Sequence, residues 1–549
     1  MGAALFQFKF LIPLLTLILT GCALPGVTGS PIAFVLALLV LGFSACRPLV
    51  DDDRTDEFIL RRLLFITSST TGTSCTGTLT NIDLSSVDLA GTGAGFKITG
   101  ENAAHNFGEH VDATGDFNGD GLGDILVGAP DVPTFLGRAY VIYGKRDGAM
   151  DLDAADLSSS ADGISILTTN VGDELLKYEE SLSFLGDING DGFDDLHVAG
   201  AGSSLYGGYY DGNRVVFGND TPTDIDITTM GAGQGFILNG TFYTGYGTGK
   251  AGDINGDGID DIAYTPGDGN GFQGQAQIIY GKTSGWGTVF TISGMPATDG
   301  FTIQANTNRN NQRGRIQGVG DINGDGVGDM VMANPGNATL PEGGAYVIYG
   351  KSGTTRGGFT AAPVPATDGY EITGTTGANW GKSVTAGDFN GDGHRDFVLG
   401  SPTYNGSNGQ LAVITSDVGT LTLGSLTSSQ GFTLEGASAE RAAYSIALTG
   451  DVNGDGLDDL LVGAHLADNG ATDSGSVYLI LGQSGIPSTG ALLADYAGIR
   501  IDGPAASARL GFDVSLGDVN GDGCADMVMG AVNASGADEV YVVYGGPAR

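Results

Sequence analysis

The sequence has few of the residues from which most enzyme active sites and zinc sites are built. Its 549 residues include only four cysteines and five histidines, and no two histidines stand at the His-x₃-His or HExxH spacing of a zinc site. No GxSxG turn is present, and GYGTGK (245–250) lacks the leading glycine and the Ser or Thr of a phosphate-binding loop. His105 and His110 fall in a predicted loop, where we expect a solvated pair. We therefore expect that the protein is not an enzyme and has no catalytic residues.

Basic residues are also scarce. Lys and Arg number 24 against 63 Asp and Glu, which gives a net charge of −39. A chain this acidic repels nucleic acid and anionic membrane surfaces, so we expect neither as a partner. The hydrophobic fraction of 41% is that of a folded protein, and the 96 glycines indicate a fold rich in turns.

Two apolar runs lie within residues 1–46, at 10–22 and 32–46. Each has the length of a signal-peptide core, and neither reaches the ~20 residues that span a bilayer as a helix. Leu19-Thr20-Gly21-Cys22 resembles a lipobox, whose cysteine becomes the lipidated N-terminus, and Phe43-Ser44-Ala45-Cys46 is a weaker match. We expect an export segment that ends in lipidation at Cys22 or Cys46, in simple secretion, or in a retained membrane-associated segment. The protein is then secreted or held in the cell envelope, and only this N-terminal anchor meets the membrane.

Residues 47–90 are predicted to form a linker, because a charged stretch is followed by Ser/Thr/Gly-rich sequence. Beyond the linker, one ten-residue pattern occurs seven times. The copies are GDFNGDGLGD (115–124), GDINGDGFDD (186–195), GDINGDGIDD (252–261), GDINGDGVGD (320–329), GDFNGDGHRD (387–396), GDVNGDGLDD (450–459) and GDVNGDGCAD (517–526). Their first aspartates stand 63 to 71 residues apart. Such a repeat decides the fold of residues 91–549.

Each copy places oxygen donors at positions 1, 3, 5 and 9 of a tight loop, counted from its first Asp. Carboxylates, an amide oxygen and a main-chain carbonyl at position 7 are the ligands that calcium prefers, and glycine at positions 4 and 6 permits the sharp turn. The predicted ligands of up to seven Ca²⁺ ions are Asp116, Asn118, Asp120, Leu122 and Asp124; Asp187, Asn189, Asp191, Phe193 and Asp195; Asp253, Asn255, Asp257, Ile259 and Asp261; Asp321, Asn323, Asp325, Val327 and Asp329; Asp388, Asn390, Asp392, His394 and Asp396; Asp451, Asn453, Asp455, Leu457 and Asp459; Asp518, Asn520, Asp522, Cys524 and Asp526. The alternative is seven Asn/Asp/Gly-rich turns without metal. Three carboxylates within nine residues would then repel one another.

Each repeat offers four strands and no sustained helical period. Apolar runs such as ILVGA (125–129) leave the loop, an aromatic strand such as AYVIYG (139–144) follows, and a GFxI segment such as GFTIQ (300–304) completes the set. Four-stranded sheets repeated radially make a β-propeller of four to eight blades. We therefore predict an all-β, seven-bladed propeller with a calcium loop in each blade.

The two ends of the repeat region predict how the ring closes. The last unit ends with VYVVYG (540–545) and lacks a following GFxI segment, whereas GFKITG (95–100) precedes the first unit. We predict that this N-terminal strand completes the last blade. Closure would bring the N-terminal strands beside unit seven, so Cys75 and Cys524 can form a disulfide; two free thiols are the alternative.

The repeats resemble FG-GAP repeats, which build the seven-bladed propeller of integrin α subunits. The matching residues are Phe107-Gly108 with Gly128-Ala129-Pro130, Tyr246-Gly247 with Thr265-Pro266, Trp380-Gly381 with Gly400-Ser401-Pro402, and Gly463-Ala464. The loops match the family's DxDxDGxxD with Asn in place of the second Asp. Unit two departs from the pattern, because it has no clear FG and reads AGAG (199–202) for GAP. The resemblance implies calcium-dependent adhesion through loops on one propeller face.

These observations favour a monomeric calcium-binding propeller that binds an extracellular protein or glycan. A secreted hydrolase or lyase with a site in the propeller channel is one alternative, and a purely structural surface protein is another. The enzyme alternative predicts a cluster of residues with perturbed pKa values on the loops of one face. The sequence shows no such cluster outside the calcium loops.

Overall fold

The structure is a computed structural model, and its described residues all lie in the compact unit of residues 71–549. They are 81–102, 105–132, 136–146, 151–157, 160–169, 175–176, 181–200, 213–240, 247–265, 275–304, 315–335, 342–353, 356–360, 364–415, 418–485, 489–532 and 538–546. The predicted export segment, with Cys22 and Cys46, lies outside these residues. No helix in the described ranges is long and apolar enough to cross a bilayer.

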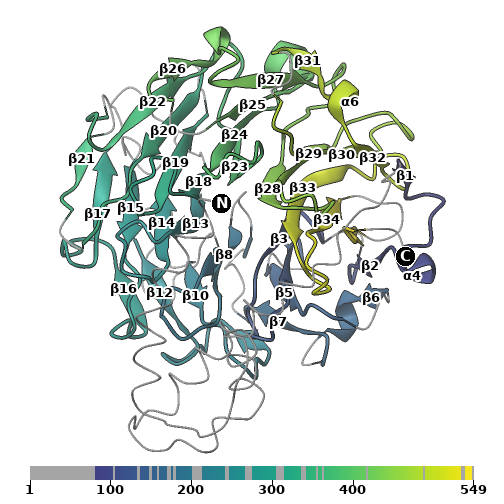
Figure 1. The fold of residues 1–549 in the computed structure, drawn as a ribbon. Coiled ribbons are helices and arrows are strands. Elements are labelled where there is room, and N and C mark those ends of the chain that lie inside the picture. The colour runs from purple at the N-terminus through teal and green to yellow at the C-terminus, as the bar shows by residue number, and fades with distance from the viewer. Residues whose placement is uncertain are drawn as a thin grey trace, which may run out of the picture. The chain divides into compact units, whose positions relative to one another are not determined.

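The described residues form seven five-stranded sheets arranged around one axis (Figure 1). Blades one to four, from the innermost strand outward, are β3(His110–Gly115), β4(Asp124–Ala129), β5(Arg138–Ile142), β7(Gly163–Leu167) and β11(Ile225–Asp226); β8(Leu182–Gly186), β9(Asp195–Val198), β10(Arg214–Val216), β12(Gly235–Asn239) and β16(Val289–Thr291); β13(Gly247–Gly252), β14(Asp261–Thr265), β15(Gln275–Ile279), β17(Gly300–Gln304) and β21(Phe359–Thr360); β18(Ile316–Gly320), β19(Asp329–Asn334), β20(Gly344–Ile348), β22(Gly369–Thr373) and β26(Leu421–Thr422).

Blades five to seven follow the same plan. They are β23(Ser383–Gly387), β24(Asp396–Ser401), β25(Gln410–Ile414), β27(Gly431–Glu435) and β31(Ala491–Leu492); β28(Ile446–Gly450), β29(Asp459–Ala464), β30(Ser476–Ile480), β32(Ile499–Asp502) and β1(Ile82–Asp83); β33(Leu510–Gly517), β34(Asp526–Ala531), β35(Glu539–Val543), β2(Gly95–Thr99) and β6(Leu152–Asp153). The helical segments are single turns: α4(Leu89–Thr92), η2(Ala154–Asp156), α5(Tyr404–Ser407), η3(Leu423–Ser425) and α6(Leu493–Tyr496).

The prediction of four strands per blade is wrong by one strand. The four inner strands of each blade are antiparallel, and a two- or three-residue outer strand pairs parallel to the fourth, as Ile372 with Leu421 in blade four. The outer strand comes from a later part of the sequence than the strand it joins, except at ring closure. Two residues are too few to show an alternating apolar pattern, so the sequence gives no signal for this strand.

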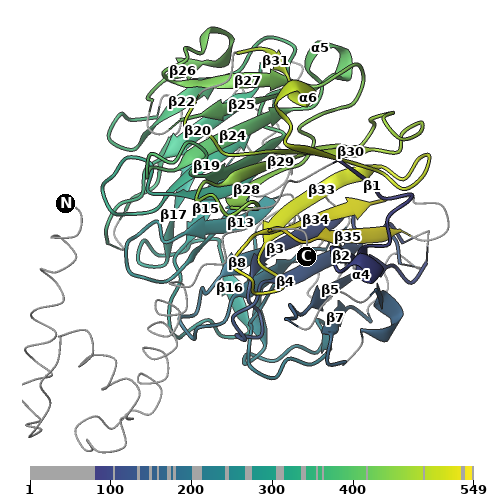
Figure 2. The same ribbon diagram turned by 45° about the vertical axis from the view of Figure 1, so that its right-hand side comes forward.

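The N-terminal strand closes the ring, as predicted. β2 pairs antiparallel with β35, with Phe96 opposite Val542, and Figure 2 shows β33, β34, β35 and β2 side by side. The innermost strands also contact each other around the whole axis, from β3 through β33 and back to β3. In addition, β1 pairs with β32 of blade six, with Ile82 opposite Ile501. The end of the predicted linker therefore belongs to the propeller.

Apolar side chains fill the space between neighbouring blades. Between blades seven and one, for example, Val127 and Ile142 pack in one buried cluster with Val528 and Val542. The second strand of every blade is buried on both faces, and each residue of β4, for example, is buried. This explains why the strands after the loops read as continuous apolar runs rather than alternating ones.

Polar side chains join the innermost strands to each other. The backbone N–H of Val111 donates to Asp513 Oδ2 (3.0 Å), Phe184 N–H donates to Asp112 Oδ2 (2.9 Å), and Leu448 N–H donates to Thr385 Oγ1 (2.9 Å). Neighbouring inner strands belong to different sheets and share no ladder. These side chains therefore satisfy amides that would otherwise lack partners near the axis.

Candidate calcium loops and the opposite face

The seven loops predicted to bind calcium join the first and second strands of every blade, so all seven lie at the same end of the propeller. Glycine at position 4 has φ between 70° and 77°, and glycine at position 6 has φ between 83° and 93°. These angles strain any residue with a Cβ atom, which explains why both positions hold glycine in all seven copies.

Position 1 organises each loop through its carboxylate. In blade one, Asp116 Oδ1 accepts the N–H of Asp120 (3.1 Å), and Oδ2 accepts the N–H of Gly121 (2.9 Å). Asn118 Oδ1 also accepts from Asp120 N–H (2.8 Å), and Asp120 Oδ1 accepts from Leu122 N–H (2.9 Å). The side chains predicted to bind calcium thus accept hydrogen bonds from the backbone of their own loop.

Position 9 has a structural role that the motif alone does not reveal. Asp124 is fully buried; its Oδ2 accepts the N–H of Phe117 (2.9 Å), and its Oδ1 accepts the N–H of Gly144 after the third strand (3.0 Å). All seven aspartates at position 9 are fully buried: Asp124, Asp195, Asp261, Asp329, Asp396, Asp459 and Asp526. Each one therefore fixes its loop to the body of its own blade.

Burial raises the pKa of these aspartates. The pKa rises to about 8 for Asp124 and Asp261 and to about 7 for Asp329 and Asp459, first because burial disfavours the charged form. Carboxylates at positions 1 and 5 of the same loop add repulsion, as Asp116 and Asp120 do for Asp124. A bound cation would remove that repulsion.

The donor set of these loops fits calcium. Three carboxylates, one amide oxygen and one main-chain carbonyl are the hard oxygen ligands that this ion takes. A carboxylate has about four acceptor sites, so the hydrogen bonds to the backbone leave lone pairs for a metal ion. In the ranges that the structure describes, however, no three His, Cys, Asp or Glu side chains already converge on one point.

The loops are linked to their neighbours around the ring. At six of the seven blade boundaries, the carbonyl of position 1 accepts the N–H of position 8 in the next blade, as Asp116 accepts from Asp194 (3.0 Å). The carbonyl of position 2 accepts a second N–H from the next blade, as Phe117 accepts from Asn219 (3.0 Å). The loops thus join neighbouring blades through backbone hydrogen bonds.

Acidic side chains at position 8 strengthen two of these boundaries. Asp194 Oδ2 accepts the N–H of Asp116 (2.8 Å), and Asp458 Oδ2 accepts the N–H of Asp388 (2.8 Å). Asp260 instead pairs with Lys250 of its own blade (3.1 Å). None of these three aspartates belongs to the predicted ligand sets.

The structure gives a physical reason for the FG and GAP residues. The N–H of Gly108 donates to the carbonyl of Gly128 (2.9 Å), and Gly381 donates to Gly400 (3.0 Å), with φ of 89° and 93° at the donors. In blade two, where FG is missing, Leu176 occupies this place with φ of 62° and donates to Ala199 (2.7 Å). Tyr246 and Pro266 of unit three lie outside the described residues.

Cys524 at position 7 of the last loop is buried and disulfide-bonded. The predicted partner, Cys75, lies outside the described residues. Pairing of these two cysteines therefore stays a prediction.

The face opposite the calcium loops carries the connections from the second to the third strand and from each blade to the next. All eleven described non-glycine residues with positive φ lie in these connections: Asn106, Leu176, Asn379, Asn405, Ser407, Ala439, Arg441, Ala443, Asp473, Ser507 and Arg509. Such conformations carry strain, and strain of this kind often marks functional surfaces.

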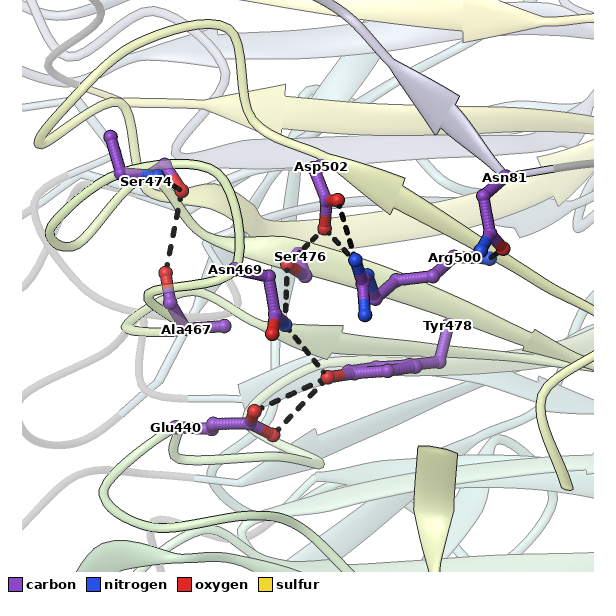
Figure 3. Close-up of polar contacts among 10 residues, drawn as sticks. Asn81, Glu440, Ala467, Asn469, Ser474, Ser476, Tyr478, Arg500 and Asp502 are labelled. Carbon is purple, nitrogen blue, oxygen red and sulfur yellow. Dashed lines mark hydrogen bonds and ion pairs between the residues drawn. The ribbon is translucent and has the colours of Figure 1, made fainter. Parts of the chain in front are cut away.

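A buried polar network holds two of these connections to blade six (Figure 3). Glu440 accepts from the Tyr478 hydroxyl (3.3 and 3.4 Å), and Asn469 Nδ2 donates to Tyr478 Oη (3.0 Å) and to Ser476 Oγ (3.1 Å). The Ser476 hydroxyl then donates to Asp502 Oδ1 (2.8 Å). Asp502 is also held in a two-point ion pair by Arg500, at 2.8 and 2.9 Å.

Sequence reasoning missed a second group of side chains, at the end of the axis away from the calcium loops. Lys382 precedes β23, and its Nζ lies 5.1 Å from the centre of the Tyr444 ring. The rings of Tyr444, His465 and Phe512 lie 4.4 to 5.3 Å from one another. These residues come from units five, six and seven, so no sequence motif could bring them together.

Two histidines are not where the sequence suggested. His105 and His110 are both buried, at 6% and 5% exposure, so the prediction of a solvated pair is wrong. His110 begins β3 and its Nε2 lies 3.4 Å from the carbonyl oxygen of Leu176. The connection that carries them packs against neighbouring elements instead of extending into solvent.

Parts of the sequence are similar to known proteins. The FG-GAP repeat model matches residues 107–142, 380–414 and 442–480. Integrin alpha-PS2 of Drosophila melanogaster is 37% identical over 176 residues, which cover 30% of this chain and 12% of the relative. Integrin alpha-IIb of Homo sapiens is 34% identical over 175 residues, 30% of this chain and 15% of the relative.

A third relative extends the match along the chain. Integrin alpha pat-2 of Caenorhabditis elegans is 28% identical over 248 residues, which cover 41% of this chain and 18% of the relative. The chain thus matches less than a fifth of the length of each of these integrins. The chain thus contains FG-GAP repeats in a closed ring of seven blades, and it is similar to integrin α subunits over about a third of its length.

Proposed function

We propose that the protein is an extracellular, calcium-stabilised propeller that binds a protein or glycan ligand in adhesion or in the organisation of the cell envelope. The observation that carries this proposal is the contrast between the two propeller faces. One face repeats the same acidic loop seven times, and the other carries connections that differ in length and sequence. Varied loops on a rigid scaffold are the usual place for ligand binding.

Calcium has a stabilising role in this proposal. The predicted ligands at positions 1, 3, 5, 7 and 9 would hold up to seven ions, and each ion would neutralise carboxylates that otherwise repel one another. Because the loops also bond to the next blade, calcium bound in one loop would strengthen a blade boundary. The bound ions would then help to hold the connections of the opposite face in one fixed arrangement.

One observation favours a second candidate function, a hydrolase or lyase with its site at the axis. Burial lowers the pKa of Lys382 to about 8, although Asp513 opposes the shift, and burial with the charge of Asp131 raises the pKa of Glu109 to about 7. Groups that titrate near neutral pH can act as acid and base. Against this candidate, burial lowers the pKa of the nearby His465 to about 3, which makes it a weak base.

The test is binding of the full-length protein to arrays of matrix proteins and glycans, once in millimolar calcium and once in chelator. Calcium-dependent hits on the array would support the proposal and identify the ligand class. A folded protein without any hit, but with hydrolase or lyase activity in a substrate screen, would contradict it in favour of the second candidate. A folded protein with neither hits nor activity would leave a purely structural role.

A further inference from the structure

The connection between β20 and β22 of blade four contains a cavity of about 350 Å³. This connection lies at the calcium-loop end of the blade, because Gly350 at its start donates its N–H to Asp329 Oδ1 in the loop of the same blade (2.8 Å). Small-molecule sites in proteins usually have volumes of ~300–1,000 Å³. The cavity is therefore large enough for a small ligand, and it is separate from the varied face.

Two cations share one carboxylate in the lining of this cavity. Lys351 Nζ and Arg356 Nη2 both bond to Asp368 Oδ1, the second at 3.0 Å. Burial opposes the effect, but the hydrogen bond from Lys351 and the charge of Arg356 hold the pKa of Asp368 below its ordinary value, so this carboxylate is charged. Among the described residues of the lining, two positive charges and one negative charge leave +1. One further negative charge would balance them.

Hydrogen-bond donors from three side chains meet in the cavity. The Arg356 side chain is only 6% exposed; its Nη1 donates to the carbonyl of Tyr349 and its Nη2 to Asp368, but its buried Nε has no partner. A buried donor without a partner costs free energy, and native structures rarely keep one without a reason. The ammonium of Lys351 has three N–H groups, and Ser352 adds an exposed hydroxyl. The lining thus offers more donors than Asp368 can use.

Blade three contains the same lysine–aspartate pair without the second cation. Lys282 pairs with Asp299 at 3.2 Å, and the two residues are 17 positions apart. Lys351 and Asp368 are also 17 positions apart and occupy the same connection, between the third and fourth strands of their blade. The lysine–aspartate pair is therefore a feature of this connection, and the added arginine is particular to blade four.

Blade three places an uncharged ring where blade four places the arginine. Trp286 stacks on Phe236 with ring centres 4.7 Å apart, and the guanidinium carbon of Arg356 lies 4.8 Å from the ring centre of Phe301. Phe236 and Phe301 are the same residue of the GFxI strand in successive units. Packing alone therefore does not require a cation at this place.

The backbone of the cavity is held by the calcium loop of blade three. Lys351 donates its N–H to the carbonyl of Ile254 (2.9 Å), and Gly353 donates its N–H to the carbonyl of Asn255 (2.8 Å). Ile254 and Asn255 are positions 2 and 3 of that loop. A backbone that is already fixed loses less conformational freedom when a ligand binds. The donors of the cavity are thus partly preorganised.

We propose that this cavity binds the sulfate ester of a sugar unit, with Lys351, Ser352 and Arg356 as donors to its oxygens. The site lies on the calcium-loop face and is additional to ligand binding by the varied face. Lysine and arginine form charge-assisted hydrogen bonds with oxyanions, and the guanidinium group is more weakly hydrated than an ammonium. Phe359 in the lining supplies apolar surface for the carbon atoms of the sugar.

Charge and the number of oxygens favour a sulfate ester over other anions. A sulfate ester has one negative charge, which balances the +1 of the lining. A phosphate monoester carries about −1.5 to −2 at pH 7, and a chain with a net charge of −39 repels the additional charge. A carboxylate has two oxygens, whereas a sulfate ester has three terminal oxygens, one for each of the three donor side chains.

The test measures binding of N-acetylglucosamine 6-sulfate to the full-length protein in millimolar calcium by ligand-observed NMR titration. N-acetylglucosamine, its 6-phosphate and glucuronic acid are titrated in the same way. We expect the sulfated sugar to bind and the neutral sugar to bind at least about tenfold more weakly, because hydrogen bonds to a charged group are lost. The 6-phosphate and glucuronic acid should each bind at least about threefold more weakly than the sulfated sugar, through repulsion in the first case and a lost hydrogen bond in the second.

Two variants test the assignment of the donors. Arg356→Trp copies the arrangement of blade three, so it removes a cation while it keeps a partner for Phe301. Lys351→Met removes the other cation from a side chain that is 41% exposed. Each variant should lose at least about tenfold in affinity for the sulfated sugar. Melting curves show that each variant is folded, and Lys351→Met alone decides the test if Arg356→Trp is not.

Lys282→Met is the matched control. It removes a lysine with the same aspartate pairing from the same connection of blade three, where no arginine accompanies it. We expect this variant to bind the sulfated sugar within about twofold of the unmodified protein, since its lysine is not part of the proposed donor set. The comparison separates the cavity of blade four from a general effect of removing one positive charge.

Several results would overturn the inference. Equal affinities for the sulfated and neutral sugars would exclude recognition of the sulfate, and so would the absence of binding by the folded protein at about 10 mM ligand. Binding that survives Lys351→Met unchanged would place the sulfate elsewhere. A 6-phosphate or uronic acid that binds as tightly as the sulfated sugar would exclude selection of the sulfate ester. The proposed function fails separately, because array hits unaffected by Lys351→Met do not use this cavity.

Discussion

On one face of the propeller, seven loops share a ten-residue pattern and one hydrogen-bonding scheme; on the other, the connections differ from blade to blade. The first face bonds each blade to the next, and the positive φ angles of its seven loops are all adopted by glycine. The second face has all eleven described positive-φ residues that are not glycine, together with the polar network of blade six and the group formed by Lys382, Tyr444, His465 and Phe512. Repetition therefore marks the part that maintains the ring, and variation marks the part available for a ligand.

Removal of calcium should have the largest effect, because it acts on all seven loops at once. Extracellular sites with Kd of about 10⁻⁴–10⁻³ M would each contribute about 0.4–1.4 kcal/mol at about 1 mM calcium. Seven such sites would give about 3–10 kcal/mol. We expect the melting temperature of the full-length protein to fall by several degrees in chelator, measured by calorimetry. An identical melting curve in both buffers would show that the loop face does not depend on calcium.

Within one loop, positions 9 and 5 should separate structural and metal-binding roles. Asp124→Ala removes the acceptor for the N–H groups of Phe117 and Gly144, which should cost about 2–5 kcal/mol of unfolding free energy, with and without calcium. Asp120→Ala, at an exposed position, loses the acceptor for the N–H of Leu122, so it should cost only about 1 kcal/mol in chelator and clearly more when calcium is present. Denaturant unfolding of both variants in both buffers makes the comparison. If the two variants lost the same unfolding free energy in chelator, the two positions would not have separate roles.

The FG glycine should tolerate substitution less well than a loop glycine with the same backbone angle. Gly108 and Gly258 both have φ of 89°, but a Cβ on Gly108 would lie 2.9 Å from Val540 Cγ2, whereas none of the atoms near Gly258 would come within 4 Å. We expect Gly258→Ala to cost about 1 kcal/mol and Gly108→Ala about 1 kcal/mol more. Thermal melts in chelator remove any effect of the loop variant on calcium binding. If Gly108→Ala lost no more stability than Gly258→Ala, the backbone around the FG–GAP hydrogen bond would have moved to accept the new methyl group.

The smallest effect should come from a single acid on the varied face. Burial, and then the charge of Asp131, raise the pKa of Glu109 to about 7 from its usual 4.5. The folded state therefore holds a proton that the unfolded chain loses, and unfolding free energy falls as pH rises from about 4.5 to about 7. Relative to the unmodified protein, Glu109→Gln should gain stability over this range. A difference that stays constant from pH 4.5 to 7 would contradict the raised pKa.

Features that repeat were predictable from the sequence. The seven loops, the strands that flank them and the closing strand 95–99 all follow from local patterns that recur at a near-constant interval. The FG and GAP residues carried the resemblance to integrin α repeats, and the family model matches three of the repeats. Each of these signals lies within one unit and is reinforced by the other copies.

Features that depend on distant parts of the chain were not predictable. The outer strand of each blade has two or three residues, so its position is set by the neighbour with which it pairs, as Ile98 pairs with Leu152. The buried state of His105 and His110 depends on how their connection packs. The group of Lys382, Tyr444, His465 and Phe512 joins residues up to 130 positions apart, which only the packing of neighbouring blades brings together.

Calorimetric titration of the calcium-free, full-length protein with calcium tests the central claim most directly. The account predicts binding of several ions, up to seven per chain, with a melting temperature that rises as the loops fill. No detectable binding at millimolar calcium, from a protein shown to be folded, would contradict the account and leave the acidic loops as turns that join the blades through the backbone alone.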